Sequence, residues 1–139
     1  MQRLLYERLP SERADILDTI RQRLQARQEV VFAYAHGSFL EDRPFHDVDV
    51  AVYLEGEEEQ AQTALALDLA AELEAAVRLP VDVRVLNHAP LGFRYHVFRG
   101  RFLFSRDEEL CVRCLEHTAM HYLDIKPLMR QALKEAMRT

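Results

Sequence analysis

Residues 36–54 read HGSFLEDRPFHDVDVAVYL, and this stretch decides how the rest of the chain is interpreted. A Gly-Ser pair, Gly37-Ser38, stands near its start, and two aspartates, Asp47 and Asp49, stand nearer its end. The polar, proline-containing segment between them is typical of a loop. After the loop, valines alternate with the aspartates, which is the period-two pattern of a β-strand.

The two aspartates are expected on one face of this strand, because successive side chains point to opposite faces. Their Cα atoms would lie roughly 6.5–7 Å apart at the usual rise per residue. Two such carboxylates repel each other and are costly to remove from water. A divalent cation relieves both effects, and Mg²⁺ prefers oxygen ligands. Two solvated aspartates at a strand end fit the same pattern, so both interpretations stay open on these residues alone.

The Gly-Ser pair follows an apolar run, residues 29–36, that predicts another strand. Glycine lets backbone N–H groups approach an anion, and a serine hydroxyl can donate to a phosphate oxygen. Phosphates at Gly37-Ser38 and metal at the aspartates would place a metal–nucleoside triphosphate between adjacent strands. A plain turn is the alternative. Two neighbours, His36 and Arg43, could also reach a phosphate, but a backbone-bonded neutral histidine and a solvated arginine are expected.

A third carboxylate, Asp82, interrupts an apolar strand predicted at residues 81–86. If that strand lies beside the one carrying Asp49, the aspartates form a single cluster. The alternative is an edge-strand aspartate that faces water and pairs with Arg84, which lies on the same face. The residues by themselves leave these two possibilities nearly balanced.

Helices are predicted before and between the strands. Residues 1–28 carry apolar side chains at helical spacing, with Ser11 as the N-cap. A second helix is expected to open in the acidic run at residues 55–60, where the helix dipole favours acids, and to reach about Arg78. Pro80 would end it.

The next part of the chain predicts a short helix and a short strand. Residues 89–99 form the helix, with Pro90 in its first turn and Gly100 as its C-cap. Residues 101–105 form the last strand of the sheet.

The C-terminal segment, about residues 106–138, is predicted to be helical. Ser105 and Glu108 match a capping box at its start, and Pro127 should end or kink it. One straight helix cannot surround an ion, so ordinary packing or solvated roles are expected for four metal-type side chains: Cys111, Cys114, His117 and His121.

Length and composition favour one domain, residues 1–139, with a single core. The formal net charge is −5 and no basic block occurs, so direct nucleic-acid binding is not expected. No apolar run approaches the roughly 20 residues of a membrane span, and no signal-peptide pattern opens the chain. The two cysteines do not suggest a disulfide framework. These observations favour a cytoplasmic protein without membrane contact.

Gly37-Ser38, the spacer and Asp47-Val48-Asp49 together resemble the signature of the polymerase-β-like nucleotidyltransferases. The short chain further resembles the minimal nucleotidyltransferases (MNT), the antitoxin members of MNT/HEPN toxin–antitoxin pairs. This resemblance implies an α+β fold, a small mixed β-sheet flanked by helices. The spacer between Ser38 and Asp47 is shorter than is usual in the family, which leaves the path of the loop open.

The resemblance also implies a chemistry. Asp47, Asp49 and Asp82 would hold Mg²⁺, with two ions expected, and Asp82 would also serve as general base. Gly37 and Ser38 would bind the β- and γ-phosphates of ATP. The partner would be a cognate HEPN-family ribonuclease toxin, silenced by transfer of AMP to one of its tyrosines, much as phosphorylation silences proteins.

Two other functions remain compatible with the sequence. The chain could be an antitoxin that neutralises the toxin by direct binding, with an idle nucleotide site. It could also be a small-molecule nucleotidyltransferase that works with a separate subunit. Three retained acids argue against an idle site.

Overall fold

The computed structural model describes residues 4–56 and 58–138. The elements follow in the order α1 (Pro10–Gln25), β1 (Val30–His36), η1 (Ser38–Leu40), β2 (Val48–Leu54), α2 (Glu59–Val77), β3 (Val81–Val85), α3 (Leu91–Phe98), β4 (Arg101–Ser105) and α4 (Glu108–Arg138). All four strands predicted from the sequence are therefore present.

The strands form one mixed sheet in the order β3-β2-β1-β4. β1 pairs antiparallel with both β2 and β4, whereas β2 and β3 run parallel. Helix α2 makes the crossover between these two parallel strands, as a parallel pair requires. The predicted α+β fold with a small mixed sheet is confirmed.

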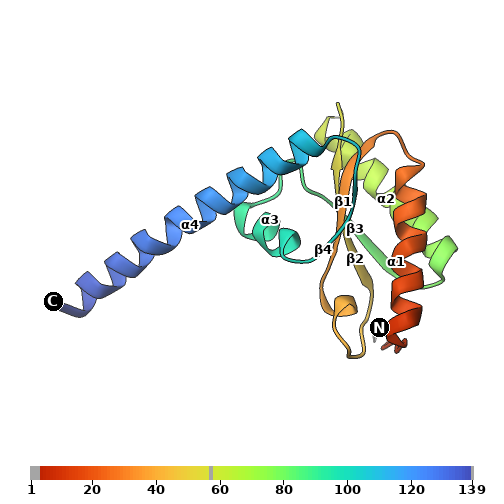
Figure 1. The fold of residues 1–139 in the computed structure, drawn as a ribbon, viewed down its shortest axis with the longest axis horizontal. Helices are drawn as coiled ribbons and strands as arrows, with labels where there is room; N and C mark the ends of the chain where they lie inside the picture. The colour runs from red at the N-terminus through yellow and green to blue at the C-terminus, as the bar shows by residue number, and fades with distance from the viewer. Residues whose placement is uncertain (1–3, 57, 139) are drawn as a thin grey trace.

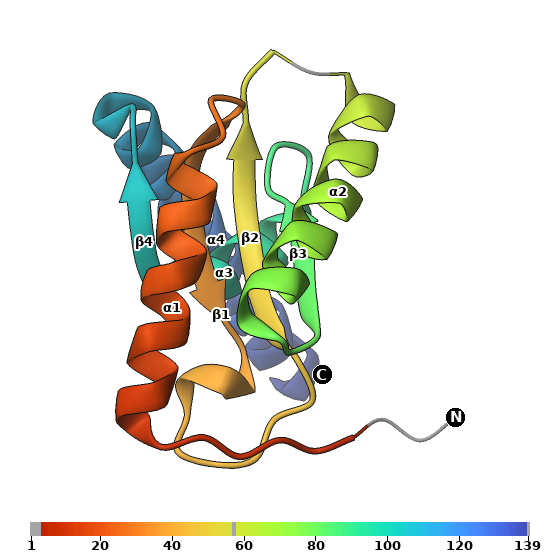
Figure 2. The same cartoon turned by 90° about the vertical axis from the view of Figure 1, so that its right-hand side faces the viewer.

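Helices cover both faces of the sheet. α1 and α2 lie against one face, and α3 with the first part of α4 lies against the other (Figures 1 and 2). Side chains alternate along β2 accordingly: Val50 and Val52 pack in the α1/α2 core, while Ala51 packs in the α3/α4 core. By the same alternation, Asp49 faces the α3/α4 side.

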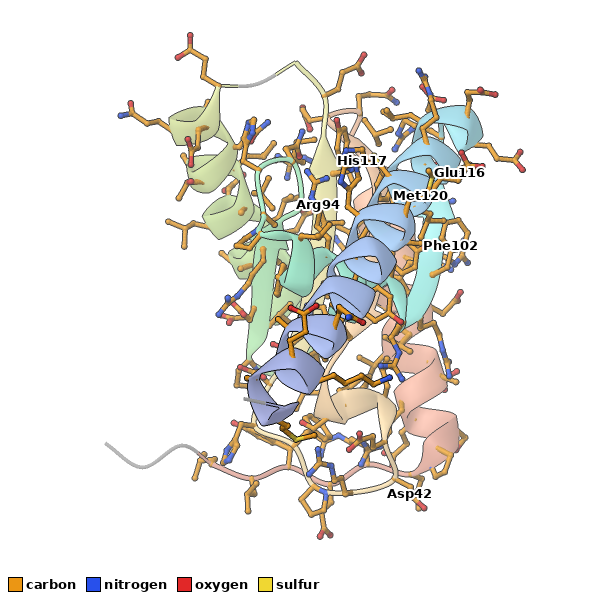
Figure 3. The ribbon with its side chains drawn as sticks, turned by 90° about the vertical axis from the view of Figure 1, so that its left-hand side faces the viewer. Asp42, Arg94, Phe102, Glu116, His117 and Met120 are labelled. Atoms are coloured by element: carbon orange, nitrogen blue, oxygen red, sulfur yellow. The ribbon has the colours of Figure 1, made fainter. Side chains whose placement is uncertain are left out.

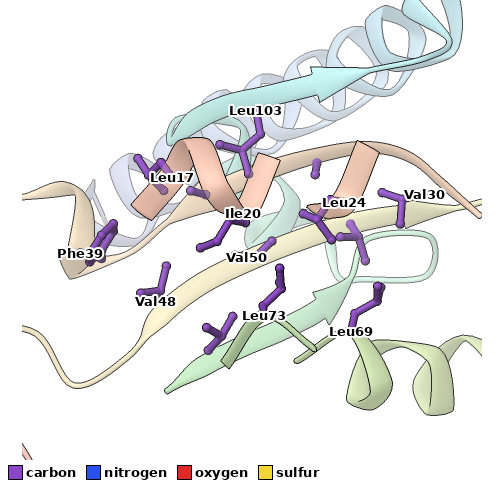
Figure 4. Packing of buried hydrophobic residues seen from close by; sticks show 14 of the residues in the cluster. Leu17, Ile20, Leu24, Val30, Phe39, Val48, Val50, Leu69, Leu73 and Leu103 are labelled. Atoms are coloured by element: carbon purple, nitrogen blue, oxygen red, sulfur yellow. The ribbon is translucent and has the colours of Figure 1, made fainter. Parts of the chain in front are cut away.

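The α1/α2 core holds the sheet in place. Ile20 and Leu24 of α1 and Leu69 and Leu73 of α2 are fully buried, and they pack together with Val50 of β2 (Figure 4). Each such side chain contributes about 1.5–3 kcal/mol on burial. This packing determines which face of each strand is buried here, and it leaves the aspartates on the opposite face.

The α3/α4 core is rich in aromatic rings. Phe32 of β1 stacks on Tyr53 of β2, with ring centroids 5.1 Å apart, and Tyr34 meets Phe98 of α3 edge-on at 5.2 Å. Cys111 of α4 is buried in the same cluster. Beyond this contact, α4 continues away from the sheet (Figure 1).

Helix starts differ from the sequence predictions in two places. α1 begins at Pro10, so residues 4–9 of the helix predicted at 1–28 precede it, and residues 1–3 lie outside the described residues. Leu9, not Ser11, occupies the N-cap of α1, because Pro10 takes the first helical position and Glu12 accepts a hydrogen bond from the Leu9 N–H at 2.8 Å. At α4 the cap is Asp107, whose Oδ1 accepts from the Leu110 N–H at 3.1 Å. The Ser105 hydroxyl only accepts from the Asp107 N–H, at 3.2 Å.

The start of α2 and the C-terminal part of α4 also differ from the sequence predictions. α2 begins at Glu59, so the acids from Glu55 to Glu58 precede the helix; residue 57 lies outside the described residues. α4 continues as one helix through residue 127, so it does not end there, where an end or a kink was predicted. Within the described ranges, no helix combines the length and the hydropathy needed to cross a membrane.

Candidate active site

Two neighbouring strands, β2 and β3, bring the predicted acids together at one end of the sheet. Asp49 of β2 is in register with Asp82 of β3, and His36 of β1 lies opposite Asp49 on its other side. Asp47 precedes Asp49 by two residues and shares its face. Asp82 thus lies beside the Asp47/Asp49 pair and on the same face of the sheet, as a joint site requires.

The electrostatics of Asp49 show how closely these groups are gathered. Burial, together with the charges of Asp47 and Asp82, raises the pKa of Asp49 to about 6, while Arg84 acts in the opposite sense. Asp47 also shares a hydrogen bond with Asp49. Since negative charge accumulates here, the site favours a cation or protonation of Asp49.

The Gly-Ser turn is packed directly on Asp49. Gly37 has φ +83° and ψ −169°, a backbone conformation essentially restricted to glycine. A Cβ at Gly37 would overlap the Oδ2 atom of Asp49. The two halves of the sequence motif, separated by a loop, therefore meet without any intervening side chain.

A pocket of about 430 Å³ opens at the Gly-Ser turn. Gly37 and Ser38 line it together with His96 of α3 and Arg99, the residue that follows α3. Arg43 also lines it but is ion-paired with Glu41. Within the described part of the chain, Arg99 forms no ion pair and instead lies over the Tyr95 ring at 5.8 Å. The pocket thus offers an uncompensated cation beside backbone and hydroxyl donors.

Helix α3 reaches this pocket because Gly100 lets the chain pass close to β1. A Cβ on Gly100 would clash with the carbonyl oxygen of Ala35 and come within 3.2 Å of the His36 Cα. The C-cap of α3 is Arg99, not Gly100 as predicted. Gly100 is therefore needed for close packing rather than for helix termination. Arg94 anchors the other side of α3 by donating to the Leu86 carbonyl at 3.1 Å (Figure 3).

Arg13 of α1 holds the loop between the two motifs, a role that the sequence does not reveal. Its guanidinium is buried and donates to the carbonyls of Phe39 (2.9 Å), Glu41 (2.7 Å) and Arg43 (2.8 Å). It also lies over the Phe45 ring at 4.9 Å. The short loop is thus tied to the body of the protein, and its path is defined.

Asp82 satisfies both interpretations of the sequence at once. It lies beside Asp49, yet β3 is an edge strand and the Asp82 Oδ2 accepts from the Arg84 Nε at 3.0 Å. Arg84 itself stacks over Phe93 of α3 at 5.6 Å. Both partners of this ion pair are partly exposed, which leaves Asp82 able to turn towards Asp49.

The carboxylates are chemically suited to Mg²⁺, which prefers oxygen ligands. Among the described residues, however, no three side chains of the metal-binding types are gathered closely enough to hold one ion as they stand. Asp82 is ion-paired with Arg84, so a metal that took Asp82 as a ligand would compete with Arg84 for it.

The cysteines and histidines of α4 do not converge. Cys111 is buried against the sheet, where burial raises the pKa of its thiol. His117 and His121 lie on the exposed side of the helix, with ring centroids 4.1 Å apart (Figure 3).

The glycine turn is thus packed on a strand aspartate that has a second aspartate in register beside it. A family model described as polymerase beta, nucleotidyltransferase, matches residues 18–109. The chain therefore belongs to this family. The matched region contains Gly37, Ser38 and all three aspartates.

Solved structures show the same fold. One describes a tri-AMPylated Shewanella oneidensis HEPN toxin in complex with MNT antitoxin; the matched chain has 18% identity and a TM-score of 0.58, with 91% of this chain and 97% of that one covered. A toxin–antitoxin structure with AMP-PNP matches at 19% identity and a TM-score of 0.64, covering 87% and 98%. A MntA–HepT structure matches at 18% and 0.62, covering 89% and 98%. A comparison with curated proteins finds no match.

Proposed function

We propose that this protein is an antitoxin nucleotidyltransferase that transfers AMP from ATP to a tyrosine of a cognate HEPN ribonuclease toxin. The observation that carries the proposal is the packing of Gly37 on Asp49, with Asp82 in register beside it. The solved structures of the same fold support the choice of substrate and partner. One of them holds AMP-PNP, and another holds a tri-AMPylated HEPN toxin.

In this proposal the pocket at the Gly-Ser turn binds the β- and γ-phosphates. The backbone around Gly37 approaches the phosphate oxygens without a side chain in the way, and the Ser38 hydroxyl donates a hydrogen bond. Arg99 supplies positive charge from the α3 side of the pocket. The protein carries a net charge of −5, so a local cation is needed to hold a polyphosphate.

The α-phosphate then lies next to the aspartates. The tyrosine oxygen of the partner attacks the α-phosphorus, the bond from that phosphorus to the β-bridging oxygen breaks, and pyrophosphate leaves. Asp82 accepts the tyrosine proton, directly or through solvent. Asp47, Asp49 and Asp82 would hold the Mg²⁺ ions, which neutralise charge on the phosphates and lower the pKa of the attacking hydroxyl.

The product explains the neutralisation. AMP on a tyrosine replaces a neutral ring hydroxyl with a negatively charged, bulky group, which disfavours the binding of RNA phosphates nearby. The acceptor is supplied by the partner.

The test is a transfer reaction followed by intact-mass spectrometry. The protein is mixed with ATP, Mg²⁺ and the toxin encoded beside it, and the mass of the toxin is recorded over time. AMP-sized increments are expected with the wild type and with Asp15→Asn, an exposed control on α1. They should be absent with Asp49→Asn. An unmodified but fully neutralised toxin would contradict the transferase and favour inhibition by binding alone.

A further inference from the structure

His36 is a buried histidine at the junction between the phosphate pocket and the aspartates. Only 6% of its surface is exposed. It lines the pocket together with Gly37 and Ser38, and it lies opposite Asp49 in the β1–β2 pair. Its ring packs edge-on against Phe93 and His96 of α3, with centroids 5.5 Å away in each case. The side chain is therefore held in one orientation from several directions.

The Nε2 atom of His36 has no hydrogen-bond partner among the described residues. A backbone-bonded histidine was expected from the sequence, and this atom does not fit that role. An unpaired buried polar atom is unfavourable for folding. Phenylalanine would provide the same aromatic packing without this cost, so the histidine calls for an explanation other than packing.

The charged and titratable groups around the His36 ring influence its protonation state. Asp47 and Asp82 interact with it from the β2 and β3 side, His96 from α3, and Arg84 from β3. Burial, and to a smaller extent His96, lowers the pKa of His36 to about 4. The ring is thus neutral at physiological pH and carries a single N–H, which can be donated without placing another charge in the site.

We propose that His36 binds the substrate: its Nε2–H donates a hydrogen bond to a phosphate oxygen of the bound nucleoside triphosphate. This inference rests on the proposed function, because it assumes that a triphosphate occupies the pocket at Gly37-Ser38. The bound phosphate would supply a partner for the buried ring atom that has none among the described residues. The contact falls between the Gly-Ser turn and the aspartates, so it also aligns the phosphate chain with the acids.

The experiment measures binding of AMP-PNP with Mg²⁺, and separately of inorganic tripolyphosphate with Mg²⁺, by calorimetry. Thermal unfolding of the same proteins is recorded alongside. The variants are His36→Phe, which keeps the aromatic packing, and His36→Gln, which keeps an N–H donor. Thr118→Val is the matched control, because Thr118 is also buried with an Oγ1 that lacks a partner among the described residues, but it lies on α4.

We expect His36→Phe to weaken the binding of both ligands about tenfold, which is the effect of losing one hydrogen bond to a charged group. Its unfolding temperature should be unchanged or higher. His36→Gln should bind within about threefold of the wild type. Thr118→Val should leave binding unchanged and should not lower the unfolding temperature.

Three results would overturn the assignment. Wild-type affinity in His36→Phe would leave the histidine without a role in binding. An equal loss of affinity in His36→Phe and His36→Gln would mean that the shape of the imidazole ring, and not its N–H donor, determines binding. If His36→Phe lost affinity for AMP-PNP but not for tripolyphosphate, His36 would contact a part of the nucleotide other than the phosphates. If the wild type bound neither ligand, while Thr118→Val and the wild type unfolded normally, the proposed function itself would fail, and this inference with it.

Discussion

The Cα of Gly37 lies against the carboxylate of Asp49, so closely that a Cβ atom at position 37 would overlap the Asp49 Oδ2 atom. The glycine belongs to the turn after β1, and the aspartate belongs to β2. Their contact joins a turn suited to phosphate to a carboxylate suited to metal. It is the structural reason for assigning both halves of the motif to one site.

Gly37→Ala should damage both stability and nucleotide binding. The backbone conformation of Gly37 costs a residue with a Cβ about 1–3 kcal/mol, and the overlap with Asp49 adds to this. Urea unfolding and calorimetry with AMP-PNP measure the two effects. Gly92→Ala is the control, since Gly92 lies in helix α3 with open space around it and alanine favours a helix. Unchanged binding in Gly37→Ala would separate the turn from the nucleotide site.

Stability should depend on pH through Asp49. Its pKa rises from 3.8 to about 6 on folding, so between about pH 4 and pH 6 the folded protein binds more protons than the unfolded chain. Relative to Asp49→Asn, the free energy of unfolding of the wild type should therefore fall as pH rises through this window, by roughly 1–2 kcal/mol after allowance for solvent screening. The comparison with Asp49→Asn is needed because His36, whose pKa is lowered to about 4, contributes in the opposite direction over the same window in both proteins. Urea unfolding at pH 4, 5, 6 and 7 tests it, and a rise in stability over the window for the wild type relative to Asp49→Asn would contradict the buried, crowded carboxylate.

Arg84→Gln should tighten Mg²⁺ binding. Arg84 pairs with Asp82 and also opposes the rise in the Asp49 pKa, so it competes with a metal for both carboxylates. Removing its charge should raise Mg²⁺ affinity about threefold or more. The stability change should stay below about 1 kcal/mol, because the ion pair is partly exposed. Mg²⁺ titration by calorimetry, with the exposed Arg113→Gln of α4 as the control, measures the effect; weaker binding would mean that Arg84 does not compete with the metal.

Arg13→Ala should release the loop between the two motifs. The change removes the buried donors to the carbonyls of Phe39, Glu41 and Arg43, and it should cost about 3 kcal/mol of unfolding free energy. Nucleotide affinity should fall with it, because the loop leads from the Gly-Ser turn to the aspartates. Arg21→Ala, an exposed change on the same helix, should cost less than about 1 kcal/mol. Equal losses for the two variants would show that the loop does not depend on Arg13.

Much of the fold could be predicted because its signals are local. Alternation of valines with aspartates identifies β2 and the shared face of Asp47 and Asp49, and prolines and glycines mark the ends of elements. The likeness of the Gly-Ser and D-x-D pattern to a known family then suggested how the strands pair. The register of Asp49 with Asp82 follows from that pairing rather than from either strand alone.

Other features depend on contacts between distant segments. Arg13 reaches carbonyls 26 to 30 residues away, and backbone acceptors leave no mark on a sequence. The N-caps of α1 and α4 were each predicted two residues away from the observed caps, because several capping residues compete there. Arg99 and His96 enter the pocket only because Gly100 lets α3 approach β1. In a sequence, a glycine that is needed for close packing, such as Gly100, cannot be distinguished from a glycine that ends a helix.

The central claim is that Gly37-Ser38 and the three aspartates bind one metal–triphosphate complex. The most direct measurement is calorimetric titration of AMP-PNP into the wild type, Asp49→Asn and Asp15→Asn, each with Mg²⁺ and with EDTA. The wild type and Asp15→Asn should bind with Mg²⁺ and not with EDTA, and Asp49→Asn should bind at least tenfold more weakly, about 1.4 kcal/mol. Equal binding in EDTA, or wild-type affinity in Asp49→Asn, would contradict it.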